Sequence, residues 1–324
     1  MELKDLKIFF MGTSYFSAKI IENLTDKGIP IATVITQPDR PVGRKKEITP
    51  PEAKKIAEKN NLPVKQFEKI NNEAMDFFRL ENPDLIIVAA YGLILPQELL
   101  DLPKFSCINV HTSLLPELRG PSPIQTALLD GLKKTGVSIM KMDKEVDHGP
   151  VLSQKETKIS KTDNYISLEE KLIKISNEIL LPAIQDLLDG KLTPQEQEHH
   201  KATFTKIISK EDGEIIWSNS ASQIEGLHKA FHVWPKVFCY WKKDNQPNSP
   251  LQKIIFWELE AIEEMPDSVN KKYGEVFRSE GGRVLIKTGE GLIAPKKIQI
   301  PGKNAMEINE FCNGQPQFIG SVLN

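Results

Sequence analysis

The first half of the chain alternates continuous apolar runs with segments whose apolar residues recur at helical spacing. Residues 6–12 and 29–36 are apolar runs that flank a segment with helical spacing and hydroxyl residues at its start. Further strands are expected at 83–90, 105–111 and 136–142, with helices between them near 50–60, 71–81 and 122–131. Continuous apolar strands that alternate with helices predict a doubly wound α/β sheet, buried on both faces.

The second half of the chain changes pattern twice. Residues 167–190 have the spacing of a long helix, which Pro182 is expected to kink or split in two. Residues 191–205 are polar and lack periodicity, which indicates an interdomain linker. Short strand-like runs separated by turn residues follow, and many short strands with little helix between them predict a small barrel. We therefore expect a first domain at 1–190 and a barrel domain at 206–324.

Composition narrows the class of protein. Hydrophobic content is 40%, charged content is 27% and the net charge is −2, which is typical of a globular protein and gives no global sign of nucleic-acid binding. No apolar run approaches the roughly 20 residues of a membrane span, and the N-terminus lacks a signal-peptide pattern. Three widely spaced cysteines offer neither a disulfide framework nor a paired metal site. We expect a reduced, cytoplasmic protein without a metal.

The stretch CINVHTSLLP, residues 107–116, places polar groups inside a strand-like run. Asn109 and His111 would share one face of the strand, because the side-chain period is two, and Ile108 and Val110 would face the core. In open α/β sheets ligands bind beyond the carboxyl ends of the strands. The two polar side chains could therefore face a ligand, or they could simply form hydrogen bonds with neighbouring loops.

A carboxylate from the stretch EVDHGP, residues 145–150, could complete this pair. Asp147 is the preferred candidate, and Asp143 and Glu145 compete with it. An amide, an imidazole and a carboxylate suit direct acyl transfer to an amine. The amide donates to the oxyanion and the imidazole takes a proton. Ser113 and Cys107 are candidate nucleophiles, but no GxSxG signature is present, so covalent catalysis is disfavoured.

Several segments resemble the folate-dependent formyltransferase superfamily. The most specific is INVHTSLLPELRGPSPIQ, and VITQPDRPVGRKK narrows the likeness to the methionyl-tRNA formyltransferase family. Matching segments span nearly the whole chain and include MGTSYFS, AAYGLILP, TGVSIMKMDKEVDHGPVL, AFHVWP and PGKNAM. The resemblance implies a Rossmann-like N-terminal formyltransferase domain and a C-terminal domain of oligonucleotide-binding (OB-like) β-barrel type.

The resemblance also assigns roles to residues. It places the catalytic triad at Asn109, His111 and Asp147. Tetrahydrofolate would bind at Ser113, Leu114, Leu115 and Pro116, with backbone around 91–94 completing the pterin slot. The formyl donor would be 10-formyltetrahydrofolate, a cosubstrate, and the acceptor would be the α-amino group of methionyl initiator tRNA. We expect a monomer.

One departure from the family pattern lies beside the triad. The family usually has a small residue or Thr after the catalytic Asp, and His148 stands there in this chain. The imidazole could titrate beside the triad and disturb the pH profile, or it could point to solvent. The second interpretation is preferred.

A basic stretch follows the second strand. Residues 37–55 contain Arg40, Arg44, Lys45 and Lys46 among prolines and a glycine. Such runs are usually solvated loops. In the family this place holds a flexible arm that grips tRNA, and affinity gained by neutralising phosphates depends on salt. In the second domain the candidates for a basic patch are Lys296, Lys297 and Lys303. The tryptophans at 217, 234 and 257 are expected to fill the core or the domain interface.

Four other functions stay open. The chain could formylate a small amine such as an amino sugar nucleotide, or hydrolyse the formyl donor; the basic stretch and the barrel argue against both. It could be an inactive RNA-binding protein, which the intact triad argues against. A nicotinamide-dependent dehydrogenase is a remote fourth possibility, because the glycine pattern GxGxxG that holds a dinucleotide is absent.

Overall fold

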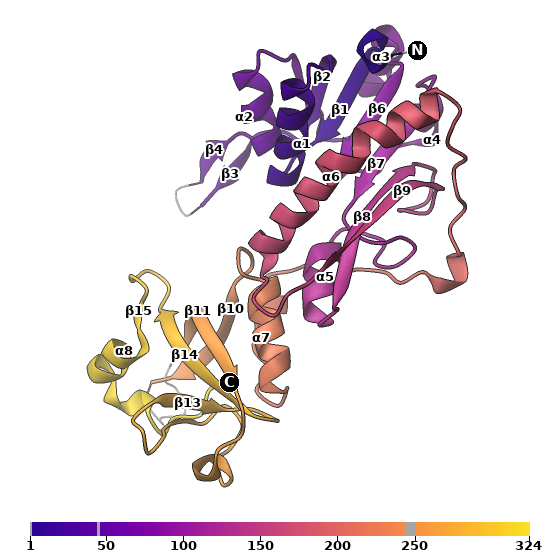
Figure 1. Cartoon of the computed structure of the whole chain (residues 1–324). Helices are drawn as coiled ribbons and strands as arrows, with labels where there is room; N and C mark the ends of the chain where they lie inside the picture. The colour runs from indigo at the N-terminus through magenta and orange to yellow at the C-terminus, as the bar shows by residue number, and fades with distance from the viewer. Residues whose placement is uncertain (1, 44–45, 244–249) are drawn as a thin grey trace. The chain divides into compact units, whose positions relative to one another are not determined.

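The computed structural model describes residues 2–43, 46–243 and 250–324, and Figure 1 shows their elements. Contacts divide the chain into two compact units. The first comprises Met1–Pro123, Lys133–Ile159 and Leu168–Lys206, and the second comprises Ile124–Leu132, Ser160–Ser167 and Ile207–Asn324. The domain boundaries expected from the sequence, at 190 and 206, stay a prediction.

The first unit is built on a seven-stranded sheet with the order β5-β2-β1-β6-β7-β8-β9. The first five strands of this order are parallel, whereas β8 pairs antiparallel with both β7 and β9. The strands are β1 Ile8–Gly12, β2 Ile31–Thr36, β5 Val64–Gln66, β6 Leu85–Ala89, β7 Cys107–His111, β8 Lys134–Lys141 and β9 Val151–Lys158. This is the predicted α/β architecture. Two strands, β5 and β9, were not expected from the sequence.

The helices lie where helical spacing predicts them, except α4, which was not expected from the sequence. They are α1 Tyr15–Asp26, α2 Glu52–Lys59, α3 Asn72–Glu81, α4 Gln97–Asp101, α5 Pro123–Leu129 and α6 Tyr165–Leu188. Two begin at side-chain caps, since Ser14 accepts a hydrogen bond from the Ser17 N–H and Asn71 accepts one from the Ala74 N–H.

Pro182 does not split the long helix. It lies inside the continuous helix α6, although proline removes one backbone hydrogen bond from a helix. Leu180, Ala183 and Ile184 flank it and are buried. We attribute the continuity of the helix to this packing on both sides of the proline, which offsets the lost hydrogen bond.

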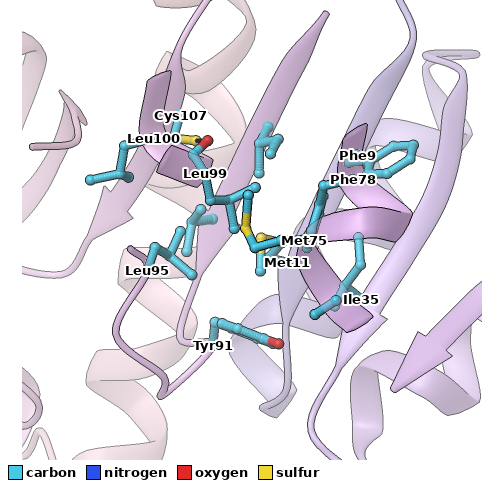
Figure 2. Packing of buried hydrophobic residues seen from close by; sticks show 13 residues of the cluster. Phe9, Met11, Ile35, Met75, Phe78, Tyr91, Leu95, Leu99, Leu100 and Cys107 are labelled. Atoms are coloured by element: carbon cyan, nitrogen blue, oxygen red, sulfur yellow. Dashed lines mark hydrogen bonds between the residues drawn. The ribbon is translucent and has the colours of Figure 1, made fainter. Parts of the chain in front are cut away.

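One face of the sheet holds an apolar cluster beneath α3 and α4 (Figure 2). Its strand residues include Phe9, Met11 and Cys107, and Met75 and Phe78 contribute from α3. Side chains alternate along a strand, so the residues at 109 and 111 of β7 project on the same face as Cys107. The cluster thus sets the face on which the polar end of β7 lies.

The basic stretch after β2 forms a hairpin where a loop was expected. Its strands are β3 Arg40–Val42 and β4 Glu47–Thr49, and they pair antiparallel. Its base is anchored by Lys54, whose Nζ lies 2.8 Å from Asp39 Oδ2 and 3.1 Å from Gln66 Oε1. This anchor fixes the start of the hairpin against α2 and β5.

The second unit is a curled antiparallel sheet. Strands follow the order β10-β11-β14-β13-β12, and β15 pairs with β14. They are β10 Val237–Lys242, β11 Leu251–Ile262, β12 Val276–Arg278, β13 Val284–Lys287, β14 Leu292–Gln299 and β15 Met306–Glu307, accompanied by helices α7 Ala221–Ala230 and α8 Ile308–Gly314. The predicted OB-like architecture is confirmed, as a sheet that curls into a half-barrel.

Only one of the three named tryptophans is a core residue. Trp217 is buried, whereas Trp234 is 48% exposed and Trp257 is 37% exposed. We expected the three tryptophans in the core or at the domain interface, and of these two places only the core can be compared. A different tryptophan, Trp241, is buried there and packs edge-on against Phe318. Trp257 is kept at the surface by its indole N–H, which donates to Gln299, and by the ammonium of Lys236, 4.2 Å from the ring centre.

Candidate active site

Asn109, His111 and Asp147 meet at one point of the first unit. The amide Nδ2 of Asn109 lies 3.1 Å from Asp147 Oδ1, and the ring Nδ1 of His111 lies 3.5 Å from Asp147 Oδ2. Because a carboxylate only accepts hydrogen bonds, the amide must present an N–H to it. An amide nitrogen carries two hydrogens, so Asn109 keeps a second N–H to offer to a ligand.

Asp147 reaches the site from the turn between β8 and β9. The turn begins beside the start of β7, where Met142 N donates to the carbonyl of Cys107, and it folds along β7 towards His111. Asp147 has a φ of +50°, a left-handed conformation that costs a residue other than glycine about 1–3 kcal/mol. The Gly120 N–H holds its carboxylate through a hydrogen bond of 2.8 Å to Oδ2.

Gly149 allows the turn to close. A Cβ at this position would lie 2.1 Å from the carbonyl oxygen of Lys141. Only glycine fits so close to that backbone. The glycine that follows Asp147 by two residues in the sequence is therefore required by the path that brings the carboxylate to β7.

His111 is held in one tautomer by the backbone. Its ring is 6% exposed, and Nε2 lies 3.0 Å from the carbonyl oxygen of Leu118. A carbonyl oxygen only accepts, so Nε2 must carry the hydrogen. In the neutral ring the lone pair is then on Nδ1, the nitrogen that faces Asp147. The imidazole is thus arranged to accept a proton beside a carboxylate.

Asp143 and Glu145, the two alternatives to Asp147, contact His148 and not His111. Asp143 Oδ2 lies 2.6 Å from His148 Nδ1, and Glu145 Oε2 lies 3.8 Å from His148 Nε2. His148 also stacks on His199, with ring centres 4.0 Å apart. Our expectation that His148 points to solvent is wrong, because these contacts leave its side chain only 27% exposed.

The SLLP segment is fastened to β8 and β9. Ser138 Oγ donates to the carbonyl of Ser113 at 2.6 Å and accepts from the Leu115 N–H at 3.0 Å. Gln154 Nε2 donates to the carbonyl of Leu115 at 2.8 Å. Leu114 lies against Gly136, where a Cβ would lie 2.5 Å from its side chain. The four residues expected to bind folate, Ser113, Leu114, Leu115 and Pro116, thus form a loop with a fixed backbone.

Neither candidate nucleophile is arranged for attack. The Ser113 hydroxyl is buried and donates to the carbonyl oxygen of Glu117. Cys107 is also buried, and burial raises the pKa of its thiol to about 12. A thiol in that state holds its proton at neutral pH, so the thiolate needed for nucleophilic attack is not formed. The arrangement favours direct transfer.

Two family models cover the chain in sequence. The model described as formyl transferase matches residues 6–184, and the model described as formyl transferase, C-terminal domain matches residues 207–316. A methionyl-tRNA formyltransferase from Caldicellulosiruptor saccharolyticus is 37% identical over 98% of this chain and 100% of that protein. The chain belongs to the methionyl-tRNA formyltransferase family. Another member, from Enterococcus faecalis, is 38% identical over 97% of both chains.

Family membership confirms the resemblance found in the sequence. Members of the family are enzymes that use formyl-tetrahydrofolate to formylate methionyl initiator tRNA. A crystal structure of HypX from Aquifex aeolicus in complex with tetrahydrofolic acid has a TM-score of 0.64 at 15% identity. The match covers 97% of this chain and 48% of the HypX chain, so this chain spans about half the length of that protein. At such identity the likeness shows the fold alone.

The segment at 91–94, expected at the pterin slot, is joined to the hairpin. The carbonyl of Tyr91 accepts from Thr13 Oγ1 at 3.0 Å and from Gln37 Nε2 at 2.9 Å. Gln37 Oε1 accepts in turn from the guanidinium of Arg40 at 3.1 Å. Gly92 has a φ of +82°, and a Cβ there would lie 2.7 Å from the Gln37 amide. The loop after β6 and the basic hairpin therefore share one polar side chain.

The structure describes some of the basic residues that are candidates for binding tRNA, and not others. Arg40 and Lys46 are exposed on the hairpin, whereas Arg44 and Lys45 lie outside the described residues. In the second unit Lys296 pairs with Glu260 at 2.8 Å. Such a pair reduces the charge that Lys296 can offer to a polyanion.

Four groups near the triad escaped the sequence reasoning. They are the Leu118 carbonyl, the Gly120 N–H, and the side chains of Arg119 and Gln197. Leu118, Arg119 and Gly120 lie in the sequence PELRG, which directly follows the strand and its SLL turn. A sequence pattern does not reveal, however, which backbone N–H or carbonyl group will contact a site. Gln197 lies in the polar segment interpreted as a linker. Its part in the site depends on a fold-back that periodicity does not reveal.

Residues 2–43, 46–243 and 250–324 hold no group of three His, Cys, Asp or Glu side chains placed to bind a metal ion. Over the same ranges, each helix is too short or too polar to cross a membrane.

Proposed function

We propose that this chain transfers the formyl group of 10-formyltetrahydrofolate to the α-amino group of methionyl initiator tRNA, for translation initiation. The observation that carries the proposal is the meeting of Asn109, His111 and Asp147 around one carboxylate. The close family likeness over the whole chain supports the choice of substrates.

The reaction is a direct displacement. The methionine amine attacks the formyl carbon and forms a tetrahedral oxyanion, to which the second N–H of Asn109 donates. The attacking nitrogen gives its proton to Nδ1 of His111, and the Asp147 carboxylate stabilises the resulting imidazolium. The oxyanion then collapses and the C–N bond to N10 of the folate breaks. N10 takes the proton from the His111 imidazolium, which returns to its neutral form. One oxyanion donor is worth about 10²–10³ in rate, and general base catalysis about 10²–10⁴.

The substrates are assigned to separate segments. The proposed folate site is Ser113, Leu114, Leu115 and Pro116 with backbone around 91–94, and its support is the rigid attachment of that loop to Ser138 and Gln154. The proposed tRNA contacts are Arg40, Arg44, Lys45 and Lys46. Gln37 links the two segments, which would place the hairpin where the charged end of the tRNA meets the formyl donor.

The proposed organisation extends the family match. Residues 1–190 form the catalytic domain, 191–205 the linker and 206–324 the OB-like tRNA-binding domain, in keeping with family models that end at 184 and begin at 207. The enzyme works as a cytoplasmic monomer without a metal. Three free, buried cysteines accord with a reducing compartment.

A competition between acceptors tests this function. Purified chain receives 10-formyltetrahydrofolate together with charged initiator tRNA and an amino sugar nucleotide, and both possible products are measured by mass spectrometry. We expect formylmethionyl-tRNA as the main product. Formylation of the sugar amine with none on the tRNA would overturn the proposal, and release of free formate alone would indicate a hydrolase.

A further inference from the structure

The side chain of Gln197 joins a buried arginine to the backbone that carries Asp147. Its amide Nε2 donates to the carbonyl of Asp147 at 3.0 Å and to that of Gly149 at 2.7 Å. Its Oε1 accepts from Arg119 Nε at 3.1 Å and from Nη2 at 2.6 Å. Both N–H groups of the Gln197 amide and both acceptor positions of its oxygen therefore form hydrogen bonds.

The chemistry of the partners fixes the orientation of this amide. A guanidinium group only donates, so the oxygen of Gln197 must face Arg119. Carbonyl oxygens only accept, so the NH₂ group must face the turn. Both side chains are buried, at 7% exposure for Gln197 and 3% for Arg119, and buried polar groups in such a network have strong geometric preferences.

Arg119 and Gly120 act on Asp147 from two sides. The N–H of Gly120 donates to the carboxylate, and the guanidinium of Arg119 orients the amide that holds the backbone. The segment that carries Gln197 is itself paired with this arginine, because Arg119 N donates to the Thr203 carbonyl and Thr205 N donates to the Arg119 carbonyl. The contacts form a closed ring around the turn.

We propose that Gln197 is a positioning residue for formyl transfer and that it keeps the Asp147 carboxylate in register with His111. Asp147 stays in a left-handed conformation that has a cost for any residue other than glycine, and the amide of Gln197 holds two carbonyls of that turn together. Loss of these two bonds lets the turn relax. A displacement of about 1 Å at a reacting group can lower a rate about 10²-fold. The inference rests on the proposed function.

The test is Gln197→Glu, which changes one atom. Glutamate keeps the length of the side chain and gains an ion pair with Arg119, but it replaces the donating nitrogen with an oxygen that faces two carbonyls. We expect kcat for formylmethionyl-tRNA synthesis to fall about 10–100-fold. KM for the formyl donor and for tRNA should stay close to the wild-type values, because Gln197 touches neither proposed binding segment.

Gln195→Glu is the matched control. The substitution is identical and lies two residues away, but the Gln195 side chain is exposed and donates to the carbonyl of Thr193, not to the turn that carries Asp147. We expect kcat and KM of this variant to equal those of the wild type. A wild-type kcat for Gln197→Glu, or equal losses in both variants, would overturn the inference.

Arg119→Lys provides a second variant. A lysine keeps the charge but cannot place two N–H donors on one amide oxygen, so kcat should fall less than in Gln197→Glu and in the same direction. Rates are expressed per folded chain, with the folded fraction taken from near-ultraviolet circular dichroism. Unchanged kcat in this variant would also contradict the inference. A wild-type chain that makes no formylmethionyl-tRNA would instead contradict the proposed function.

Discussion

The carboxylate of Asp147 lies beside Nδ1 of His111, at 3.5 Å, while the opposite ring nitrogen lies 3.0 Å from the Leu118 carbonyl. The backbone, and not the carboxylate, therefore sets the tautomer of the neutral ring. The carboxylate faces the nitrogen that takes the proton. In this arrangement Asp147 contributes most after the proton has moved, by stabilising the imidazolium.

Asp147→Asn removes that electrostatic contribution together with one acceptor, because the amide offers a single oxygen to the N–H groups of Asn109 and Gly120. Asparagine tolerates a left-handed backbone and can still accept from the Gly120 N–H, so the turn should persist without its charge. We expect kcat to fall about 10²–10⁴-fold, the range of general acid–base effects, with tRNA affinity unchanged. Asp143→Asn is the control on the same turn, since Asp143 binds His148 instead of His111. Equal kcat values for the two variants would refute the role of Asp147.

Removing hairpin charges should weaken use of tRNA and spare use of the folate. We expect Arg44→Ala and Lys45→Ala to raise KM for tRNA and to lower the slope of log affinity against log salt by about 1 for each charge removed. KM for 10-formyltetrahydrofolate should not change. The control is Lys4→Ala, at an exposed lysine near the N-terminus. Unchanged tRNA kinetics at moderate salt would make the hairpin a solvated surface feature.

Ser138→Ala should loosen the proposed folate loop. The hydroxyl contacts two backbone groups of the SLLP segment, and a buried group left without a partner costs about 1–3 kcal/mol. We expect KM for 10-formyltetrahydrofolate to rise about tenfold, which corresponds to about 1.4 kcal/mol. Ser153→Ala on β9, a half-buried serine on the neighbouring strand, is the control. A change in tRNA KM with none in folate KM would contradict the assignment of the loop.

The burial of the three cysteines affects how the stability of the protein depends on pH in the alkaline range. Burial raises the pKa of Cys107 to about 12, and it also raises the pKa of Cys239 and Cys312. The unfolded chain therefore loses its thiol protons first, so the thiols' contribution to stability is full below about pH 8.5 and is lost as pH rises towards 12. We expect a falling midpoint of urea unfolding over that range.

The same burial predicts slow thiol chemistry in the folded chain. A thiol reagent should label the native protein slowly and label all three cysteines after unfolding in urea. Rapid labelling of Cys107 in the native chain, with loss of activity that substrate prevents, would revive a covalent mechanism.

The sequence predicted the parts of the site that depend on local periodicity. Asn109 and His111 lie on one face because β7 is a regular strand. The apolar runs at 6–12 and 83–90 became the buried strands β1 and β6, of which β6 pairs with β7. The choice among three carboxylates in residues 143–147 could be ranked but not decided, because it depends on how the turn folds back along β7. β9 was missed because Val151–Lys158 is mostly polar. It is the edge strand of the sheet, where polar residues are common.

Long-range polar contacts were beyond the reach of pattern analysis. Gln197 lies 50 residues from the backbone that it holds. Its segment is polar and lacks periodicity, which are also the properties of a linker. The stacking of His148 on His199 was missed for the same reason, since it joins the turn after β8 to a short 3₁₀ helix, His199–Lys201, inside that polar segment.

The role of Asn109 as oxyanion donor is tested by the single-turnover rate of formyl transfer by Asn109→Ala. The enzyme is mixed in excess with charged initiator tRNA and 10-formyltetrahydrofolate, and tRNA affinity is measured separately by filter binding. We expect a rate about 10²–10³-fold below wild type with unchanged tRNA affinity, because one oxyanion donor is lost. A rate equal to wild type would contradict this role, since the formyl oxygen would then have no need of Asn109.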